Sequence, residues 1–329
     1  MHAVIISQPG DPDVLKLQEL PDPTINDNEV LIQVAGAGVN RADLLQRRGL
    51  YPSPEGYRDE LPGLEISGII IRLGKNVPDK WRINQEVMAL VDGEGYASLA
   101  AVDYKMLMPV PKNVSLLHAA AIPEVFLTAY DALVLQCGLK QQDKILVHAA
   151  GSGVGTAAIQ IASRFNCDIY GTASNDDKLT FAKSLGLNHG INYNTDKFDD
   201  YISNNTNKSG VDIILDVVGS NYFEQNINSL SIKGRMIVIG LLGGDKVNLS
   251  LSKILRRRLH IIGTVLRSRS RDEKIVLTNE FSVNFLDYFY SNNAKPIVDK
   301  VFPAAEANQA HTFMEKNLNT GKIILDFTV

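Results

Sequence analysis

The chain has 329 residues, of which 45 % are hydrophobic and 21 % charged, and its formal net charge is −4 at pH 7. This length suits about two domains, and a weakly negative chain has no overall attraction to nucleic acid or to an anionic membrane surface. Two cysteines are too few for a disulfide framework and fit a reducing compartment, so we expect a cytoplasmic protein.

Residues 1–123 are expected to form a β domain. Valine- and isoleucine-rich runs at 29–34, 65–71 and 86–91 are separated by Gly and Pro turns, which indicates short, partly antiparallel strands. The chain opens with Met-His-Ala-Val-Ile-Ile, a strand pattern without the charged region and cleavage site of a signal peptide. We find no run of about 18 apolar residues, so the sequence predicts no membrane span.

The most informative stretch follows at 144–160, Lys-Ile-Leu-Val-His-Ala-Ala-Gly-Ser-Gly-Val-Gly-Thr-Ala-Ala-Ile-Gln. A short strand, a turn of small residues and a helix start form the usual frame of a dinucleotide site. The Gly slots of the G-x-G-x-x-G pattern hold Ala150, Ser152 and Gly155, so the Ser152 hydroxyl could donate to a phosphate. Gly153 and Val154 complete the predicted phosphate loop. Taken alone, a strand–helix turn without any ligand is an equally good interpretation.

The residues downstream favour the dinucleotide site. Apolar runs without alternation are separated by helical patterns, which indicates a parallel sheet covered on both faces. We expect strands at 167–172, 190–193, 211–218, 234–240 and 259–264 and a helix at 176–185. Loops rich in small residues follow several of these strands, at the edge where such sheets bind ligands.

These patterns divide the chain. We expect an α/β protein with a Rossmann domain at 124–264, inserted into a β domain formed by 1–123 and completed by 265–329. Residues 321–327 read as one more strand of that β domain. An insertion of this kind creates a cleft, which is a common place for a ligand pocket.

The end of the second Rossmann strand favours NADPH over NADH. NAD-binding proteins usually place an acid there to bind the ribose hydroxyls, but this chain has Ala173. Ser174, Lys178 and Tyr193 are candidate ligands of a 2′-phosphate. The acids at 176–177 argue the other way, although acids in a first helical turn also serve to complement the helix dipole.

Two groups of arginines, at 256–258 and at 267, 269 and 271, are the only concentrated positive charge that we single out. They flank a run that reads as a buried strand. We therefore assign them to solvent, to subunit contacts or to the cofactor rather than to nucleic acid.

Several motifs together resemble the zinc-free quinone oxidoreductase branch of the medium-chain dehydrogenase/reductase superfamily, especially its tumour-suppressor-inducible group. The motifs are Gly38-Val-Asn-Arg-Ala-Asp-Leu-Leu-Gln-Arg-Arg-Gly-Leu-Tyr-Pro52, Pro62-Gly-Leu-Glu-Ile-Ser-Gly68, Ala119-Ala-Ala-Ile-Pro-Glu-Val-Phe-Leu-Thr-Ala129, the loop from Ser152, Leu266-Arg-Ser-Arg269 and Gly321-Lys-Ile323. The resemblance implies a GroES-like β domain beside the Rossmann domain. It also implies a homo-oligomer, a dimer or a tetramer.

The residues at the superfamily's zinc positions predict a metal-free protein. Zinc members bind catalytic zinc through a Cys, a His beside a Glu and a later Cys, whereas this chain has Asn40 and Leu64-Glu65, with Cys137 as the nearest later thiol. Catalytic zinc needs about three protein ligands. We interpret His118 and His148 as packed or capping groups.

Without zinc, a quinone or another conjugated carbonyl is the expected acceptor, because its π system spreads the added charge and needs only hydrogen-bond donors. Tyr51 and Asn40 are the candidate donors, Tyr51 being as well explained as a packing aromatic. Asp43 is interpreted as a cap or an orienting group, and Glu65 as a buried group with a backbone or Arg partner. The resemblance also implies cofactor contacts at Thr128, Val218, Gly240, Leu241, Leu266, Arg267, Asn319 and Lys322.

Three functions remain open at this stage. The first is an NADPH-dependent quinone reductase, transferring hydride or single electrons. The second is conjugate reduction of an alkenal or an enoyl compound, which uses the same hydride geometry. The third, of a different class, is a non-catalytic NADPH-binding redox sensor or structural protein.

Overall fold

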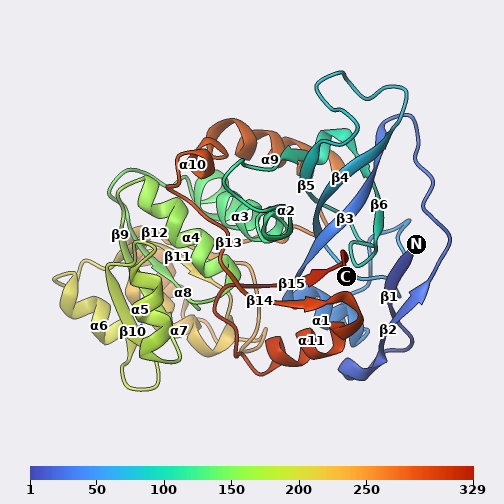
Figure 1. Ribbon diagram of the computed structural model, residues 1–329. Helices are drawn as coiled ribbons and strands as arrows, with labels where there is room; N and C mark the ends of the chain where they lie inside the picture. The colour runs from blue at the N-terminus through green and yellow to red at the C-terminus, as the bar shows by residue number, and fades with distance from the viewer. The chain divides into compact units, whose positions relative to one another are not determined.

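A computed structural model describes all residues from 1 to 329 and divides them into two compact units (Figure 1). Unit 1 contains residues 1–127 and 266–329, and unit 2 contains residues 128–265. The first boundary falls inside one helix, and the second follows the last strand of unit 2.

Unit 1 is built on a seven-stranded sheet in the order β14-β15-β3-β4-β5-β7, with β6 paired to β3. The pairs are antiparallel except for β14 with β15. A separate hairpin joins β1 to β2. The strands of unit 1 are β1 (His2–Ile6), β2 (Leu15–Glu19), β3 (Glu29–Val39), β4 (Glu65–Leu73), β5 (Glu86–Leu90), β6 (Leu99–Asp103), β7 (Leu107–Pro109), β14 (Val298–Pro303) and β15 (Lys322–Asp326).

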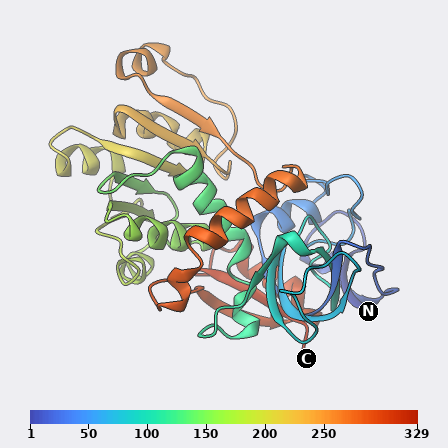
Figure 2. The ribbon, with the colours of Figure 1, turned by 90° about the horizontal axis from the view of Figure 1, so that it is seen from above.

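The central strand β3 is long and bends. Its pairing with β4 shifts register at Leu31/Ile32 and again at Val34/Gly36, and such irregularities increase the local twist of a sheet. The strands of this sheet are visibly curved in Figure 2. Gly38 near the end of β3 is required sterically, because a Cβ there would lie 2.2 Å from Glu65 Oε1. The missing side chain therefore makes room for a buried carboxylate.

The helices of unit 1 enclose a second, aromatic part of the core. Phe126 of α3 has its ring centre 4.9 Å from that of Phe289 and 6.4 Å from that of Phe281, which are favourable edge and tilted geometries. These contacts fix α3 against the long helix α9 and the short helix α10. The helices are α1 (Arg41–Arg47), α2 (Leu116–Ala119), α3 (Pro123–Tyr130, which ends in unit 2), α9 (Arg271–Asn284), α10 (Asp287–Tyr290) and α11 (Ala307–Glu315), with short 3-10 turns at Pro12–Val14, Tyr104–Met106 and Ala304–Glu306.

One helical stretch has the length and composition of a membrane-spanning helix. Leu116–Gln136 is long and apolar enough by length and composition, and 72 % of its most apolar window is buried inside the protein. Burial of this extent is what a core helix of a globular domain shows.

Unit 2 contains a six-stranded parallel sheet in the order β10-β9-β8-β11-β12-β13. The strand order reverses between β8 and β11, so the helices that follow β8 and β9 and those that follow β11 and β12 cover opposite faces of the sheet. The elements are β8 (Lys144–Val147), β9 (Asp168–Ala173), β10 (His189–Asn192), β11 (Val211–Asp216), β12 (Leu230–Val238), β13 (His260–Gly263), α4 (Gly153–Arg164), α5 (Asp176–Lys183), α6 (Phe198–Asn205), α7 (Ser220–Ser229), α8 (Leu251–Arg257) and a π-helical segment at Asp131–Gln136.

The predicted α/β class and the parallel sheet are confirmed, with one correction. The run at 259–264 was interpreted as a buried strand, but β13 lies at the edge of the sheet and Ile261 is 39 % exposed. The apolar residues of this strand are therefore only partly buried. Arg257, beside that strand, donates to the carbonyl groups of Ile227, Asn228 and Leu230, and so caps the C-terminal end of α7.

Candidate active site

The predicted phosphate loop joins β8 to α4 in unit 2. Ser152 is the N-cap of α4, and its Oγ accepts a hydrogen bond from the backbone N–H of Gly155 at 3.0 Å. Gly155 must be a glycine, because a Cβ there would lie 2.3 Å from the carbonyl oxygen of Ala149. The loop thus turns tightly into the N-terminus of α4, and a helix N-terminus after such a turn is the usual frame of a pyrophosphate site. The side chain of Ser152 caps this helix.

The four residues predicted to select the cofactor lie together. Asn192 of β10 pairs with Ala173 of β9, so the ends of the two strands are adjacent. The backbone N–H of Tyr193 donates to the carbonyl of Ala173 at 3.2 Å. Lys178, in the first turns of α5, passes close to the phosphate loop, since a Cβ on Gly151 would lie 3.2 Å from its Cβ.

The acids that argue against a phosphate here stand on the helix. Asn175 caps α5 by accepting from the backbone N–H of Lys178 at 2.9 Å, and Asp176 and Asp177 occupy the first turn. Asp176 also accepts from the side chain of Asn192 at 3.0 Å. These contacts explain both acids as helix-start residues, and Ala173 itself is buried with no carboxylate in its place.

The remaining predicted cofactor contacts of unit 2 lie at the ends of β11 and β12. The buried carboxylate of Asp216 accepts from the backbone N–H groups of Val218 and Gly219, at 2.7 and 3.1 Å. A Cβ on Gly240 would lie 3.0 Å from the carbonyl oxygen of Val217, so the two loops touch there. Leu241 follows and is 55 % exposed. All these positions lie at the carboxyl edge of one sheet.

Unit 1 holds a buried ion pair in place of the zinc ligands. The ammonium of Lys322 contacts Glu65 Oε1 and Asn40 Oδ1 at 2.6 Å and donates to the carbonyl of Val39 at 2.7 Å. The amide nitrogen of Asn40 donates to Glu65 Oε1 at 3.0 Å and to the carbonyl of Gly38 at 3.2 Å. Asn40 and Lys322 thus have every donor engaged inside unit 1. Glu65 was expected to have a backbone or an Arg partner: the backbone N–H of Glu124 donates to its Oε2 at 2.8 Å, and its charged partner is Lys322 rather than an arginine.

A second buried network adjoins this ion pair. Asp43 accepts from the backbone N–H of Asn40 at 2.7 Å, and so caps α1, and also accepts from the hydroxyl of Tyr96 at 3.0 Å. The Tyr96 hydroxyl lies 3.1 Å from Nε2 of His311, whose Nδ1 lies 3.3 Å from Arg47. Burial raises the pKa of Asp43 to about 6 and lowers that of His311 to about 3, where Arg47 adds to the effect. Both interpretations of Asp43, cap and orienting group, agree with these contacts.

Tyr51 is held by an arginine from the far end of the sequence. The guanidinium carbon of Arg267 lies 4.8 Å from the centre of the Tyr51 ring, a cation–π distance. The same guanidinium donates to Gln46 Oε1 at 2.6 Å, to Ser53 Oγ at 3.2 Å and to the carbonyl of Tyr51 at 3.3 Å. Its Nε is buried without a hydrogen-bond partner. The Tyr51 hydroxyl itself has no recorded partner, and the side chain is half-buried.

Glu124 is the site residue that our sequence reasoning missed, although it lies in the quoted Ala-Ala-Ile-Pro-Glu motif. It is the second residue of α3, and its backbone N–H donates to Glu65 Oε2 at 2.8 Å. Removal from water, and next the charge of Glu65, raise the pKa of Glu124 to about 8. The sequence carried no signal for this pKa, because the proximity of Glu65 to Glu124 arises only in the folded chain, where like charges in one site raise a carboxyl pKa.

The remaining predicted cofactor contacts lie in several parts of the chain. Leu266 is buried and Asn319 donates to the carbonyl of Gly321 at 2.7 Å. Thr128 lies in α3 and is half-buried. His148 is packed, with its nitrogens 3.0 Å from Thr172 Oγ1 and 2.7 Å from Asn226 Oδ1.

The residues present do not fit zinc. No group of three or more His, Cys, Asp or Glu side chains in the chain could hold a metal ion. At the zinc positions an amide and an ammonium stand beside one carboxylate, and the ammonium already provides the positive charge that Glu65 needs. A dication added there would face Lys322 and be repelled.

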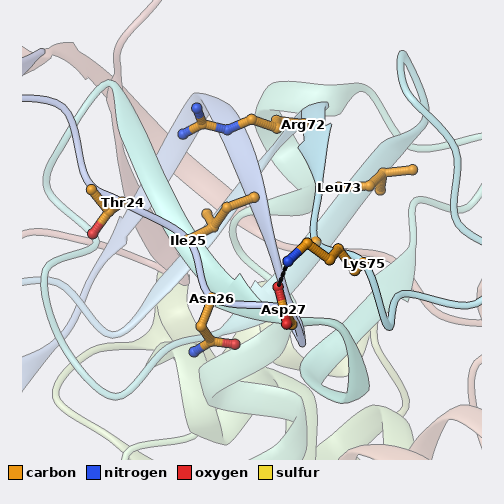
Figure 3. A pocket seen from close by; sticks show the side chains of 8 residues that line it. Thr24, Ile25, Asn26, Asp27, Arg72, Leu73 and Lys75 are labelled. Carbon is orange, nitrogen blue, oxygen red and sulfur yellow. Dashed lines mark ion pairs between the residues drawn. The ribbon is translucent and has the colours of Figure 1, made fainter.

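Two surface hollows lie elsewhere in unit 1, and the first is small and open to solvent. It has a volume of about 330 Å³ and is lined by residues 24–27 and 72–75 of unit 1, with an ion pair of 3.5 Å between Lys75 and Asp27 (Figure 3). A second hollow is lined by residues 80 and 82–85. Neither contains a predicted site residue, so neither bears on the chemistry.

Comparison with known proteins agrees with this geometry. Residues 26–112 match the alcohol dehydrogenase GroES-like domain, and residues 153–280 match the zinc-binding dehydrogenase domain. Human quinone oxidoreductase is 28 % identical over 331 residues, covering 99 % of this chain and 97 % of its own. Quinone oxidoreductase-like protein 2 of Bos taurus is 27 % identical over 315 residues, covering 94 % of this chain and 88 % of its own.

Two solved structures are also similar. An NAD-dependent alcohol dehydrogenase has a TM-score of 0.89 at 30 % identity and covers 99 % of both chains. The CurK enoyl reductase has a TM-score of 0.86 at 28 % identity and covers 99 % of this chain and 98 % of its own. The chain belongs to the medium-chain dehydrogenase/reductase superfamily, in its quinone oxidoreductase branch. It is an oxidoreductase that uses a nicotinamide cofactor and acts on a small molecule.

Proposed function

We propose that the protein is an NADPH-dependent quinone oxidoreductase that reduces its acceptor without a metal. The observation that carries the proposal lies at the position of the superfamily's zinc. There the side chains of Lys322, Asn40 and Glu65 form an ion pair and hydrogen bonds with one another. With no Lewis acid for a simple carbonyl, the acceptor has to delocalise the added charge itself. A quinone does so.

NADPH is proposed over NADH on the residues at the ends of β9 and β10. Ala173 stands where NAD-binding proteins usually have an acid, so no carboxylate would repel a 2′-phosphate there. The hydroxyl of Ser174, the ammonium of Lys178 and the phenol of Tyr193 would bind that phosphate. One similar structure is of an NAD-dependent enzyme, so family membership alone does not decide between the two cofactors. The phosphate loop from Ser152 to Gly155 would bind the pyrophosphate in either case.

The residues of each unit then have separate tasks. NADPH, when bound, supplies a hydride. Unit 2 orients the cofactor through the phosphate loop and the ends of its strands. In unit 1 the Tyr51 hydroxyl donates a hydrogen bond to the acceptor oxygen that gains charge, and Arg267 fixes the tyrosine from behind. Holding two reactants in line supplies much of the catalysis when the acceptor is already activated.

A matched set of assays tests the function. NADPH oxidation is followed with 1,2-naphthoquinone, a short alkenal and crotonyl-CoA at equal protein concentration. We expect the quinone to give the highest kcat/KM. Turnover of crotonyl-CoA or the alkenal alone would replace quinone reduction by conjugate reduction, which the similarity to the CurK enoyl reductase supports. Tight NADPH binding with no turnover of any acceptor would support a non-catalytic sensor or structural protein.

A further inference from the structure

We propose that Glu124 is a catalytic acid, which delivers to the reduced acceptor the proton that hydride transfer leaves missing. The inference rests on the proposed reduction of a quinone or conjugated carbonyl. It extends that function by a residue to which the sequence reasoning gave no role.

The backbone of Glu124 is held in place by a hydrogen bond, but its carboxyl group has no partner within the protein. The backbone N–H of Glu124 is bound to Glu65 Oε2, which fixes the start of α3, while the side-chain carboxyl has no recorded hydrogen bond or ion pair. Its side chain is half-buried rather than sealed, so at least part of it is accessible.

Neither of the two lysines near Glu124 is free to neutralise it, because both are already paired. The ammonium of Lys274 contacts Asp92 Oδ1 at 2.6 Å and donates to the carbonyl of Arg267 at 2.8 Å. The ammonium of Lys322 has its three donors on Val39, Asn40 and Glu65. Glu65 therefore stays beside Glu124 as a negative neighbour and disfavours a second negative charge. The charged groups that shift the pKa of the Glu124 carboxyl are Glu65, Lys322, Asp43 and Lys274. The charge of Glu124 in turn affects the pKa values of Tyr51 and Arg267.

Glu124 adjoins the network at the zinc position, because its backbone N–H is bound to Glu65 Oε2 and Glu65 Oε1 contacts Asn40 and Lys322. Both Tyr51, the proposed donor to the acceptor oxygen, and Arg267 respond electrostatically to Glu124. The buried Nε of Arg267 has no partner. A phenol, a guanidinium and a carboxyl group with spare hydrogen-bonding capacity thus gather in one region of unit 1.

The proton balance of the reaction requires such a group. A quinone that accepts a hydride gains two electrons and one hydrogen, and needs one more proton to become the hydroquinone. The proton leaves the carboxyl oxygen of Glu124 for the reduced oxygen, and the Glu124 carboxylate is reprotonated from water. With a pKa of about 8, the carboxyl is mostly protonated at neutral pH and is near the optimum for a general acid.

The first test is the pH profile of quinone reduction in Glu124→Gln, Glu124→Asp and the control Glu19→Gln, an exposed glutamate on β2 of the same unit. The unmodified enzyme should lose activity as pH rises through about 8. Glu124→Gln should lower kcat about 10²-fold, within the usual range for a general acid, with that alkaline limb absent. Glu124→Asp should recover part of the rate and restore a limb, and Glu19→Gln should match the unmodified enzyme.

A second test needs no turnover. In the folded protein the pKa of Glu124 lies near 8, above its ordinary 4.5, so the folded state retains a proton that the unfolded state releases. Stability should therefore fall as pH rises from about 4.5 to about 8. Glu124→Gln lacks this loss of stability. The melting temperature of the variant minus that of the unmodified protein should therefore rise across this pH window and become constant above it.

The outcomes separate the two proposals. If the unmodified protein reduces quinone while Glu124→Gln keeps both its rate and its alkaline limb, Glu124 is not the acid and the proposed function survives. A melting-temperature difference that does not change with pH would also overturn the inference. If the unmodified protein reduces none of the acceptors with NADPH, the proposed function fails, and with it the role of Glu124.

Discussion

At the scale of single residues, several side chains that the sequence singles out have a structural contact and a proposed chemical role at once. Ser152 caps α4 and is proposed to bind the pyrophosphate, and Tyr51 packs under Arg267 while its hydroxyl has no recorded partner. A simple deletion of either side chain changes both properties together. Variants that separate the two are therefore the informative ones.

Ser152 can be tested by keeping the cap and changing the charge. Ser152→Ala should weaken NADPH binding by about 1 kcal/mol, the net contribution of one hydrogen bond, and should also destabilise the protein by about 1 kcal/mol through loss of the cap. Ser152→Asp retains a good N-cap but places a carboxylate beside the pyrophosphate, so NADPH affinity should fall further while the melting temperature is preserved. Calorimetric titration and thermal unfolding measure the two effects. Equal NADPH affinity in all three proteins would remove Ser152 from the site.

Ala173 is the residue on which cofactor choice depends most. NADPH should bind at least about tenfold tighter than NADH, which corresponds to about 1.4 kcal/mol. Ala173→Asp should reverse much of this preference, because the new carboxylate repels a 2′-phosphate and accepts from ribose hydroxyls. Ala173→Asn is the uncharged control. Fluorescence titration with both cofactors provides the ratio, and equal affinities in the unmodified protein would contradict the assignment.

Tyr51 is tested by removing only its hydroxyl. Tyr51→Phe keeps the ring beneath Arg267 and should lower kcat for quinones with little change in NADPH affinity. The decrease should stay below the roughly 10²–10³-fold seen when one donor to a localised oxyanion is lost, because a quinone spreads its charge. Tyr290→Phe, at a phenol that is 45 % exposed on α10, is the matched control. If Tyr51→Phe equals the unmodified enzyme on every quinone, Tyr51 is a packing residue.

At the scale of elements, periodicity and composition predicted most of what forms unit 2. The runs at 211–218 and 234–240 became β11 and β12, and the expected helix at 176–185 became α5 (Asp176–Lys183). Parallel strands are buried on both faces, so an unbroken apolar run identifies them. The same rule failed at β13, because an edge strand with a similar composition is exposed on one side. Position in a sheet is a tertiary property that a local pattern does not contain.

The exposed edge strand leads to a prediction about assembly. Eight of the large apolar side chains that are exposed lie between 241 and 265, among them Leu251, Leu255 and Ile261 at 72, 78 and 39 %. β13 is a short edge strand, His260–Gly263, and an exposed edge with apolar side chains beside it is a template for pairing with another chain. We expect a second copy of the chain to pair there, so that the protein elutes as a dimer or tetramer of the 36.1 kDa chain.

Light scattering on Ile261→Lys tests this assembly. The molar mass of Ile261→Lys should be closer to that of a single chain, because a charged side chain on the edge strand opposes pairing with another chain. Ile83→Lys, at an exposed isoleucine of unit 1, should leave the mass unchanged. An unmodified protein with the mass of a single chain would refute the expectation of a homo-oligomer.

At the scale of the whole molecule, the buried charges of unit 1 were the least predictable part. Asn40, Glu65 and Lys322 are up to 282 residues apart in sequence yet share hydrogen bonds of 2.6–3.0 Å. The sequence showed that the zinc ligands were replaced, but not that an ammonium would stand at their position. Nor did it reveal Glu124, whose properties follow from its neighbours rather than from its motif. Such pairings depend on the folded arrangement of β3, β4 and β15.

The central claim is direct hydride transfer from NADPH to a quinone with no metal involved. The measurement that tests it most directly is quinone reduction by protein freed of metal with a chelator, using NADPH deuterated at the transferred position of the nicotinamide. We predict undiminished kcat/KM after metal removal, no stoichiometric zinc by elemental analysis, and a slower rate with the deuterated cofactor. Loss of activity on chelation that zinc restores, or the absence of any quinone-dependent NADPH oxidation, would contradict the account.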